Sequence, residues 1–157
     1  MSGLFLFLVN QELKKNMKTL ILPFVLFSFL ANAQSTIVGK WKSVDDETNE
    51  VKSIVEIFEN KGMIYGKILK IFPKAGEDTD PICDKCPSDD GRFKKKIIGM
   101  EIIKDMKKSG DEYTEGNILD PEVGKIYSCR LWMEGNDLKV RGYWGPFYRT
   151  QTWHRAN

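Results

Sequence analysis

The stretch Gly116–Gly145, GNILDPEVGKIYSCRLWMEGNDLKVRGYWG, carries the clearest fold signal in the chain. Apolar and polar residues alternate along it, and the alternation is interrupted at Asp120–Gly124 and at Gly135–Asp137. Both interruptions consist of residues that favour tight turns. Alternation at period two is typical of half-buried strands. The stretch therefore predicts three antiparallel strands joined by two hairpins.

The same pattern extends toward both ends of the chain. Turn residues recur about every ten positions after Gln34, and the only helical segment predicted is a single turn at Lys104–Lys108. A long segment from about Pro73 to Lys96 interrupts the strands, and a connection of that length is often functional or tied down. Eight strands are predicted, at residues 37–44, 51–58, 63–72, 97–103, 112–119, 126–133, 138–144 and 148–155.

Eight antiparallel strands joined by hairpins predict an all-β domain. Closing the sheet into a small up-and-down barrel hides both of its edge strands. A barrel of about eight strands has an interior just wide enough for side chains or for one small ligand. A two-sheet β-sandwich is the alternative architecture.

The N-terminal region predicts export. Met17 and Lys18 precede an apolar run, Leu20–Leu30, which is followed by the small residues of Ala31–Ala33. A positive start, a short apolar run and an A-x-A site describe a secretory signal peptide, whereas a membrane span needs about 20 apolar residues. We expect residues 1–33 to form the signal region, with the true start at Met17 and cleavage after Ala33. Residues 34–157 then form one barrel domain in the periplasm or outside the cell.

The charge of the cleaved chain is balanced. Removing residues 1–33 takes away three lysines and one glutamate, so 21 basic and 21 acidic residues remain. Such a balance argues against nucleic acid or an anionic membrane surface as the main partner. The basic run Arg92–Lys96 is interpreted as a solvated loop face. The residue directly after Ala33 is Gln34 rather than a cysteine that could carry a lipid, so no membrane anchor is expected after cleavage. No cofactor is expected, because the sequence contains no nucleotide-binding glycine motif.

Cys83 and Cys86 form a CxxC pair inside the long segment. A redox site places such a pair at a helix N-terminus, and no helix is predicted to follow it. A structural zinc site could use Cys83, Cys86, Cys129 and His154, although Cys129 lies on an apolar strand face. Because an exported protein meets oxidising conditions, a Cys83–Cys86 disulfide is the leading interpretation and zinc is the alternative.

The first and last predicted strands carry residues that point to a family. The first predicted strand opens with VGKW at Val38–Trp41, and the last is RTQTWHR at Arg149–Arg155. This arrangement resembles the lipocalin-like, or calycin, signature, in which a late arginine packs over the tryptophan. Trp41 would then close one end of the barrel, with Arg155 as the first candidate for the cation–π contact and Arg149 as the second.

The sequence from about Ile37 to Arg155 also resembles the bacterial exported family catalogued as domain of unknown function 2147. The resemblance rests on the segments GKWKSVDDETNEVKSIVEIFE, GMIYGKILKIF, CDKC and GNILDPEVGKIYSCRLWMEGNDLKVRGYWG together with RTQTWHR. It implies an exported, lipocalin-like barrel whose biochemical role is not established. It carries over no catalytic residue.

These features predict a non-enzymatic protein that binds a small, partly apolar molecule in the cell envelope. Aromatic strand residues are the candidate cavity walls: Trp41, Tyr65, Tyr127 and Trp144. The long segment that carries Cys83 and Cys86 is expected to cover or flank the open end of the barrel. One alternative is a structural or interaction module with a filled barrel, which would contact protein partners through Trp132 and the Phe147–Tyr148 pair. Another is an enzyme of unknown reaction, for which no catalytic residue is identified.

Overall fold

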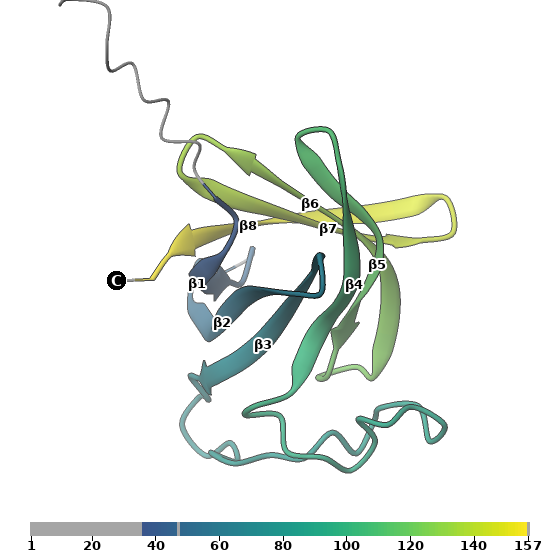
Figure 1. Ribbon diagram of the computed structural model, residues 1–157. Helices are drawn as coiled ribbons and strands as arrows, with labels where there is room; N and C mark the ends of the chain where they lie inside the picture. The colour runs from purple at the N-terminus through teal and green to yellow at the C-terminus, as the bar shows by residue number, and fades with distance from the viewer. Residues whose placement is uncertain (1–35, 47, 157) are drawn as a thin grey trace, which may run out of the picture. The chain divides into compact units, whose positions relative to one another are not determined.

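The computed structural model describes residues 36–46 and 48–156. Within these residues, eight strands follow one another around a closed antiparallel barrel, so each strand pairs with its neighbours in the chain and β1 pairs with β8 (Figure 1). The strands are β1 (Gly39–Val44), β2 (Val51–Asn60), β3 (Met63–Ile71), β4 (Glu101–Ser109), β5 (Glu112–Asp120), β6 (Lys125–Glu134), β7 (Asp137–Trp144) and β8 (Phe147–Arg155).

The predicted up-and-down barrel is confirmed, and the β-sandwich alternative is wrong. The predicted helical turn at Lys104–Lys108 is also wrong, because these residues belong to β4, which begins at Glu101 rather than at residue 97. Ile103 and Met106 both enter the core. A positive φ of 59° at Asp105, between them, accompanies a register shift that breaks the alternation. The bulge places Ile103 and Met106, three residues apart, on the same face of the strand, and this spacing resembles that of a helical turn.

One end of the barrel is closed by Trp41. Its side chain is fully buried, and its indole N–H donates a hydrogen bond to the carbonyl oxygen of Ile37 at 2.7 Å. The guanidinium of Arg155 lies 4.0 Å from the centroid of the Trp41 ring. The same guanidinium donates to the carbonyl oxygens of Val38, at 3.0 Å, and of Thr36. Arg155, the first candidate of the sequence analysis, therefore occupies the position over the tryptophan.

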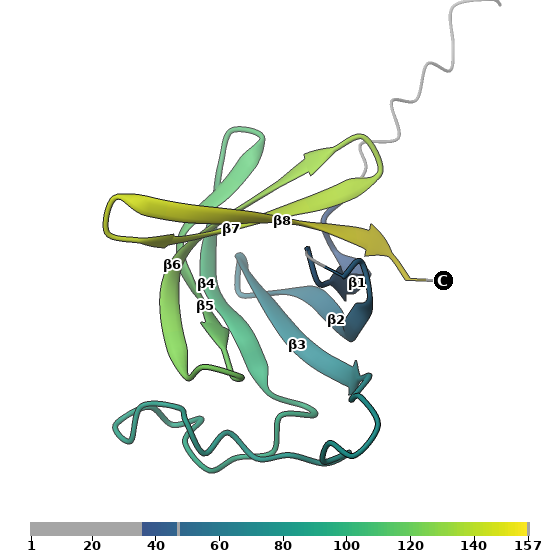
Figure 2. The same cartoon turned by 180° about the vertical axis from the view of Figure 1, so that it is seen from behind.

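The connection between β3 and β4, residues 72–100, is a long loop that runs beneath the ends of β3 to β6 (Figures 1 and 2). Internal backbone hydrogen bonds hold it, among them Cys83 N–H to Lys95 O at 2.8 Å and Ile97 N–H to Pro81 O at 2.9 Å. It also lies very close to the β5–β6 turn, where Gly124 has a φ of +70° and a Cβ would overlap the carbonyl group of Lys85. Only glycine permits that approach.

The run Arg92–Lys96, which the sequence predicted to be a solvated loop face, is only partly exposed to solvent. Arg92 is only 6% exposed, and it binds both carboxylate oxygens of Asp90 as well as the carbonyl oxygen of Glu101. Phe93 packs against the core, whereas Lys94, Lys95 and Lys96 are exposed. A buried arginine with a bidentate carboxylate partner fixes this part of the loop to the start of β4.

Candidate ligand-binding site

The barrel contains a cavity of about 870 Å³ that opens at one end. In an up-and-down barrel the β1–β2, β3–β4, β5–β6 and β7–β8 connections all leave from the same end. Residues of the first three connections line the cavity, and so do Trp144 and Phe147, which flank the β7–β8 turn. We call these four connections, together with the strand ends beside them, the cavity mouth. Trp41 does not belong to the lining, because it closes the other end.

The deep wall of the cavity is largely apolar. Inward-facing side chains from several strands form it, and they include Ile68, Ile118, Tyr127, Val140 and Trp153. A few polar groups lie among them. The hydroxyls of Ser43 and Ser53 are 2.9 Å apart, and the indole N–H of Trp153 donates to Gln151 Oε1 at 3.0 Å. An apolar wall with a few fixed polar groups is typical of a small-molecule site.

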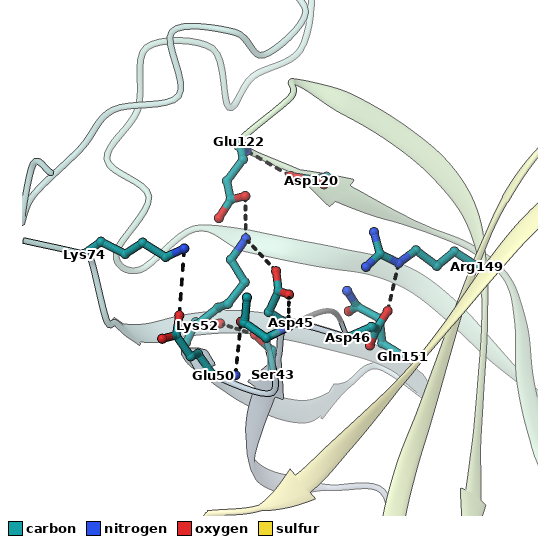
Figure 3. Close-up of polar contacts among 12 residues, drawn as sticks. Ser43, Asp45, Asp46, Glu50, Lys52, Lys74, Asp120, Glu122, Arg149 and Gln151 are labelled. Atoms are coloured by element: carbon teal, nitrogen blue, oxygen red, sulfur yellow. Dashed lines mark hydrogen bonds and ion pairs between the residues drawn. The ribbon is translucent and has the colours of Figure 1, made fainter.

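The cavity mouth carries ion pairs that join distant segments of the chain (Figure 3). Lys52 Nζ lies 2.5 Å from Glu122 Oε2 and 4.0 Å from Asp45 Oδ2, so it connects the start of β2 to the β5–β6 turn and to the β1–β2 turn. Arg149 Nε lies 2.8 Å from Asp46 Oδ2. Most of these side chains are exposed, and exposed pairs are each worth about 1 kcal/mol or less. Weak, water-accessible pairs of this kind separate at little cost in free energy.

The long loop adds two further contacts to this network. Lys85 Nζ donates to the carbonyl oxygen of Glu122 at 2.9 Å, and Lys74 Nζ lies 3.8 Å from Glu50 Oε2. The loop therefore contacts both the β5–β6 turn and the segment before β2. It covers part of the cavity as well as bordering it, since Pro73, Pro81 and Ile82 are among the lining residues.

The four predicted aromatic wall residues are not brought together. Tyr127 is half-buried in the wall, and Trp144 stands at the mouth with 65% of its surface exposed. Tyr65 lies on the outer face of β3, because Ile64 and Ile68 take the inward positions on that strand. Its ring stacks on Phe58, and its hydroxyl donates to Asp105 Oδ1 at 2.9 Å, which raises the pKa of the tyrosine. Neither Tyr65 nor Trp41 contributes to the cavity.

Trp153 and Gln151 are among the lining residues that the sequence pattern did not single out. Both lie on β8, where every second residue from Gln151 to Arg155 faces the interior side. Because Arg155 was expected to lie over Trp41, its side chain had to point to the interior side of β8. Alternation along the strand then puts Trp153 and Gln151 on the same side, so the expected position of Arg155 could have identified both residues.

The cysteines have separate roles. The predicted Cys83–Cys86 disulfide is confirmed, and both residues are buried. Cys129 is a free, buried thiol inside the barrel, and burial raises its pKa to about 12. His154 is on the barrel exterior, with Nδ1 2.8 Å from Asp137 Oδ1. The four residues of the alternative zinc site are thus not assembled, and the described residues contain no cluster of three or more side chains suited to a metal ion.

Comparison with known protein families identifies the family of this chain. The model of a bacterial family described as "uncharacterized protein conserved in bacteria (DUF2147)" matches residues 39–155. The chain belongs to this family. The match begins at the first residue of β1 and ends at the last residue of β8, so the DUF2147 unit coincides with the complete barrel.

A solved structure shares the fold of this DUF2147 protein. It is HP1028 from the human pathogen Helicobacter pylori, which is described as belonging to the lipocalin family. The two chains superpose with a TM-score of 0.64 at 23% sequence identity, over 78% of this chain and 84% of the other. The likeness shows a lipocalin-type barrel. No curated protein matches the sequence. No helix long and apolar enough to cross a membrane occurs in residues 36–46 and 48–156.

Proposed function

We propose that this protein is a non-enzymatic carrier that binds one small, partly apolar molecule in the cell envelope. The observation that supports the proposal is the open cavity of about 870 Å³ at one end of a lipocalin-type barrel. Its volume lies within the range of about 300–1,000 Å³ that is usual for small-molecule sites. Among the lining residues are neither Cys129 nor His154, so the wall offers no thiol–imidazole pair for covalent chemistry.

The distribution of polarity indicates how such a ligand lies. Its apolar part would contact the deep wall around Ile118, Val140 and Trp153, and its polar end would face the charged mouth around Lys52 and Glu122. Burying about 200 Å² of apolar ligand surface contributes about 5 kcal/mol, before the cost of immobilising the ligand. That gain favours an amphipathic molecule over a fully polar one.

Native mass spectrometry of protein purified from its own host tests the proposal. We expect one small molecule per chain, released by mild collisional activation. A Gly142→Leu variant should abolish the adduct, because a side chain at this cavity position begins 3.4 Å from Tyr127 Cβ. Tyr143→Leu, one residue along on the same strand and absent from the lining, is the matched control and should keep the adduct. Wild-type protein that carries no adduct and binds no fluorescent fatty-acid analogue contradicts the proposal.

Export is the second part of the proposal. It is supported by the apolar run Leu20–Leu30 and the Ala31–Ala33 site, which lie outside the described residues. N-terminal sequencing of the protein recovered from its host should begin at Gln34, and the protein should be found in the envelope or medium fraction. Recovery of the full-length chain from the cytoplasm contradicts export without affecting the cavity.

A further inference from the structure

The turn between β7 and β8 exposes three neighbouring aromatic side chains. Trp144, Phe147 and Tyr148 are 65%, 68% and 63% exposed, the highest values among the exposed large hydrophobic residues described. We call residues Trp144–Tyr148 the hairpin tip. Trp144 and Phe147 are directly paired, and the two residues between them are Gly145 and Pro146. Figures 1 and 2 show this hairpin extending sideways beyond the other strands.

The conformation of the hairpin tip is fixed. Gly145 has a φ of +57°, whereas the ring of Pro146 restricts its own φ to about −65°. A positive angle followed by a negative one is the type II′ turn, whose twist matches that of paired strands. The turn therefore presents the aromatic side chains on a defined backbone, and the backbone pays little ordering cost when they contact a partner.

The exposed area is too small for a stable protein interface. Each aromatic side chain offers about 150–250 Å² when it is buried, so three that are about two-thirds exposed offer roughly 300–500 Å². A stable protein–protein contact needs about 800 Å² from each partner. A convex aromatic tip of this size is suited instead to insertion between lipid headgroups, where tryptophan and tyrosine are enriched.

Positive charges accompany the hairpin tip. Lys125 Nζ lies 5.1 Å from the centroid of the Trp144 ring, and the guanidinium carbon of Arg141 lies 4.5 Å from that of Tyr148. Arg149, the next residue, is paired with Asp46. The two cations, each stacked on an amphipathic ring, can pair with phosphate groups once the tip touches a lipid surface. The charge of the whole domain is balanced, so it provides no long-range attraction to that surface. The aromatic side chains would therefore provide most of the affinity.

We propose that the hairpin tip docks on the surface of a lipid bilayer, with Trp144 and Phe147 entering the headgroup region. Trp144, Phe147, Tyr148 and Arg149 also line the cavity mouth. Docking through the hairpin tip thus brings the mouth next to the membrane, where a partly apolar ligand can be collected or released. The docking itself needs no ligand, so it stands independently of the proposed carrier function.

Vesicle co-sedimentation of the residue 34–157 domain tests this docking. The probes are vesicles of phosphatidylcholine alone and vesicles that also contain phosphatidylglycerol. We expect binding to both, several-fold stronger to the anionic vesicles, and at least tenfold weaker for the triple variant W144S/F147S/Y148S. The control is Ile98→Ser, which removes an exposed apolar side chain from the long loop and should bind like the wild type. Unfolding curves verify that the variants fold.

A second readout locates the contact. The fluorescence of Trp144, obtained as the difference between the wild type and Trp144→Phe, should shift to shorter wavelength when vesicles are added. Absence of vesicle binding, or equal binding by wild type and triple variant, overturns the proposal. So does a hairpin tip that binds a host protein and no vesicle. The cavity variant Gly142→Leu should keep vesicle binding, which separates failure of the docking from failure of the carrier function.

Discussion

At the scale of single residues, Arg155 makes several of the contacts that stabilise the closed end of the barrel. It covers the face of Trp41 and bonds the carbonyl oxygens of Thr36 and Val38, so one side chain ties β8 to the segment that precedes β1. The planar guanidinium is what allows both roles at once, because it stacks through its face while its N–H groups donate in its own plane.

Replacing Arg155 should therefore be costly. We expect Arg155→Ala to lower the free energy of unfolding by about 2–3 kcal/mol, from the lost cation–π contact and two hydrogen bonds. Arg155→Lys should recover less than half of this loss, because an ammonium cannot stack and fork together. Denaturant unfolding measures both. Arg130→Ala, which removes an exposed ion pair with Glu112, is the control, and an equal loss there would contradict a special role for Arg155.

Asp90 makes part of the stability depend on pH. The hydrogen bonds from Arg92 lower the pKa of Asp90 to about 2, below its ordinary value of 3.8. A lowered pKa in the folded state stabilises the protein above the unfolded pKa, and the stabilisation disappears as the pH falls from about 4 to about 2. Asp90→Asn should cost about 1–2 kcal/mol at pH 7 and almost nothing near pH 2.

Unfolding curves at several pH values check this dependence on Asp90. The exposed neighbour Asp89 provides the matched control, since Asp89→Asn should leave the pH profile of stability unchanged. A difference between wild type and Asp90→Asn that stays constant across this range would show that the ionisation of Asp90 contributes nothing to stability.

At the scale of elements, the sequence predicted strands well and positions within them less well. Period two located seven of the eight strands to within two residues at each end, because one face of each meets the core. At β4 the predicted strand overlapped only at residues 101–103, because the bulge at Asp105 shifts the parity, and the pattern could not show which face of β3 carries Tyr65. The reason is that Tyr65 is flanked by Ile64 and Gly66, and a glycine facing inward gives no apolar signal.

The long loop was identified by its length and was expected to cover or flank the open end of the barrel. The contacts that hold it there could not be predicted, because they join segments distant in sequence, such as Lys85 and Glu122. The prediction of Tyr127 and Trp144 as ligand contacts remains to be tested by binding. The spacing of Cys83 and Cys86 left both a disulfide and a zinc site open, and the oxidising conditions expected of an exported protein favoured the disulfide.

The disulfide should stabilise the long loop more than the barrel. Closing so short a ring contributes about 2 kcal/mol by the chain-entropy estimate. A Cys83→Ala/Cys86→Ala variant should therefore melt no more than about 10 °C lower, and amide exchange should accelerate in residues 72–100 but not in the strands. Equal acceleration throughout the barrel would contradict this local role.

Alkylation provides the matched control for the disulfide. Denatured wild-type protein should accept one label, on Cys129, without reductant and three labels with it, since the chain has three cysteines. Three labels without reductant would show that the bond is absent.

At the scale of the whole molecule, the two ends of the barrel are held by different interactions. The closed end is held by buried contacts around Trp41, and the open end by exposed ion pairs. Screening by salt weakens exposed pairs and leaves buried contacts nearly unchanged. Access to the cavity can therefore vary without loss of the fold.

Lys52 is the residue that tests this difference. Lys52→Ala should speed the uptake of a fluorescent fatty-acid analogue several-fold, while it lowers the free energy of unfolding by less than about 1 kcal/mol. Stopped-flow fluorescence and denaturant unfolding measure the two effects. Lys107→Ala is the matched control, because its exposed pair with Glu115 joins β4 and β5 rather than segments of the mouth. Equal uptake rates for both variants would show that the mouth pairs do not control access.

The seam between β1 and β8 has a consequence for how the protein folds. All other neighbouring strands are joined by a turn or loop, but this seam pairs Trp41 with Arg155 and Lys42 with His154, more than 100 residues apart. The entropy of closing so large a loop delays such contacts, so β8 completes the barrel late. Until then the nascent chain is an open sheet with two unpaired edges, which other chains can join. Pairing of β8, the last strand of the barrel, with β1 thus ends the period in which the protein is prone to aggregate.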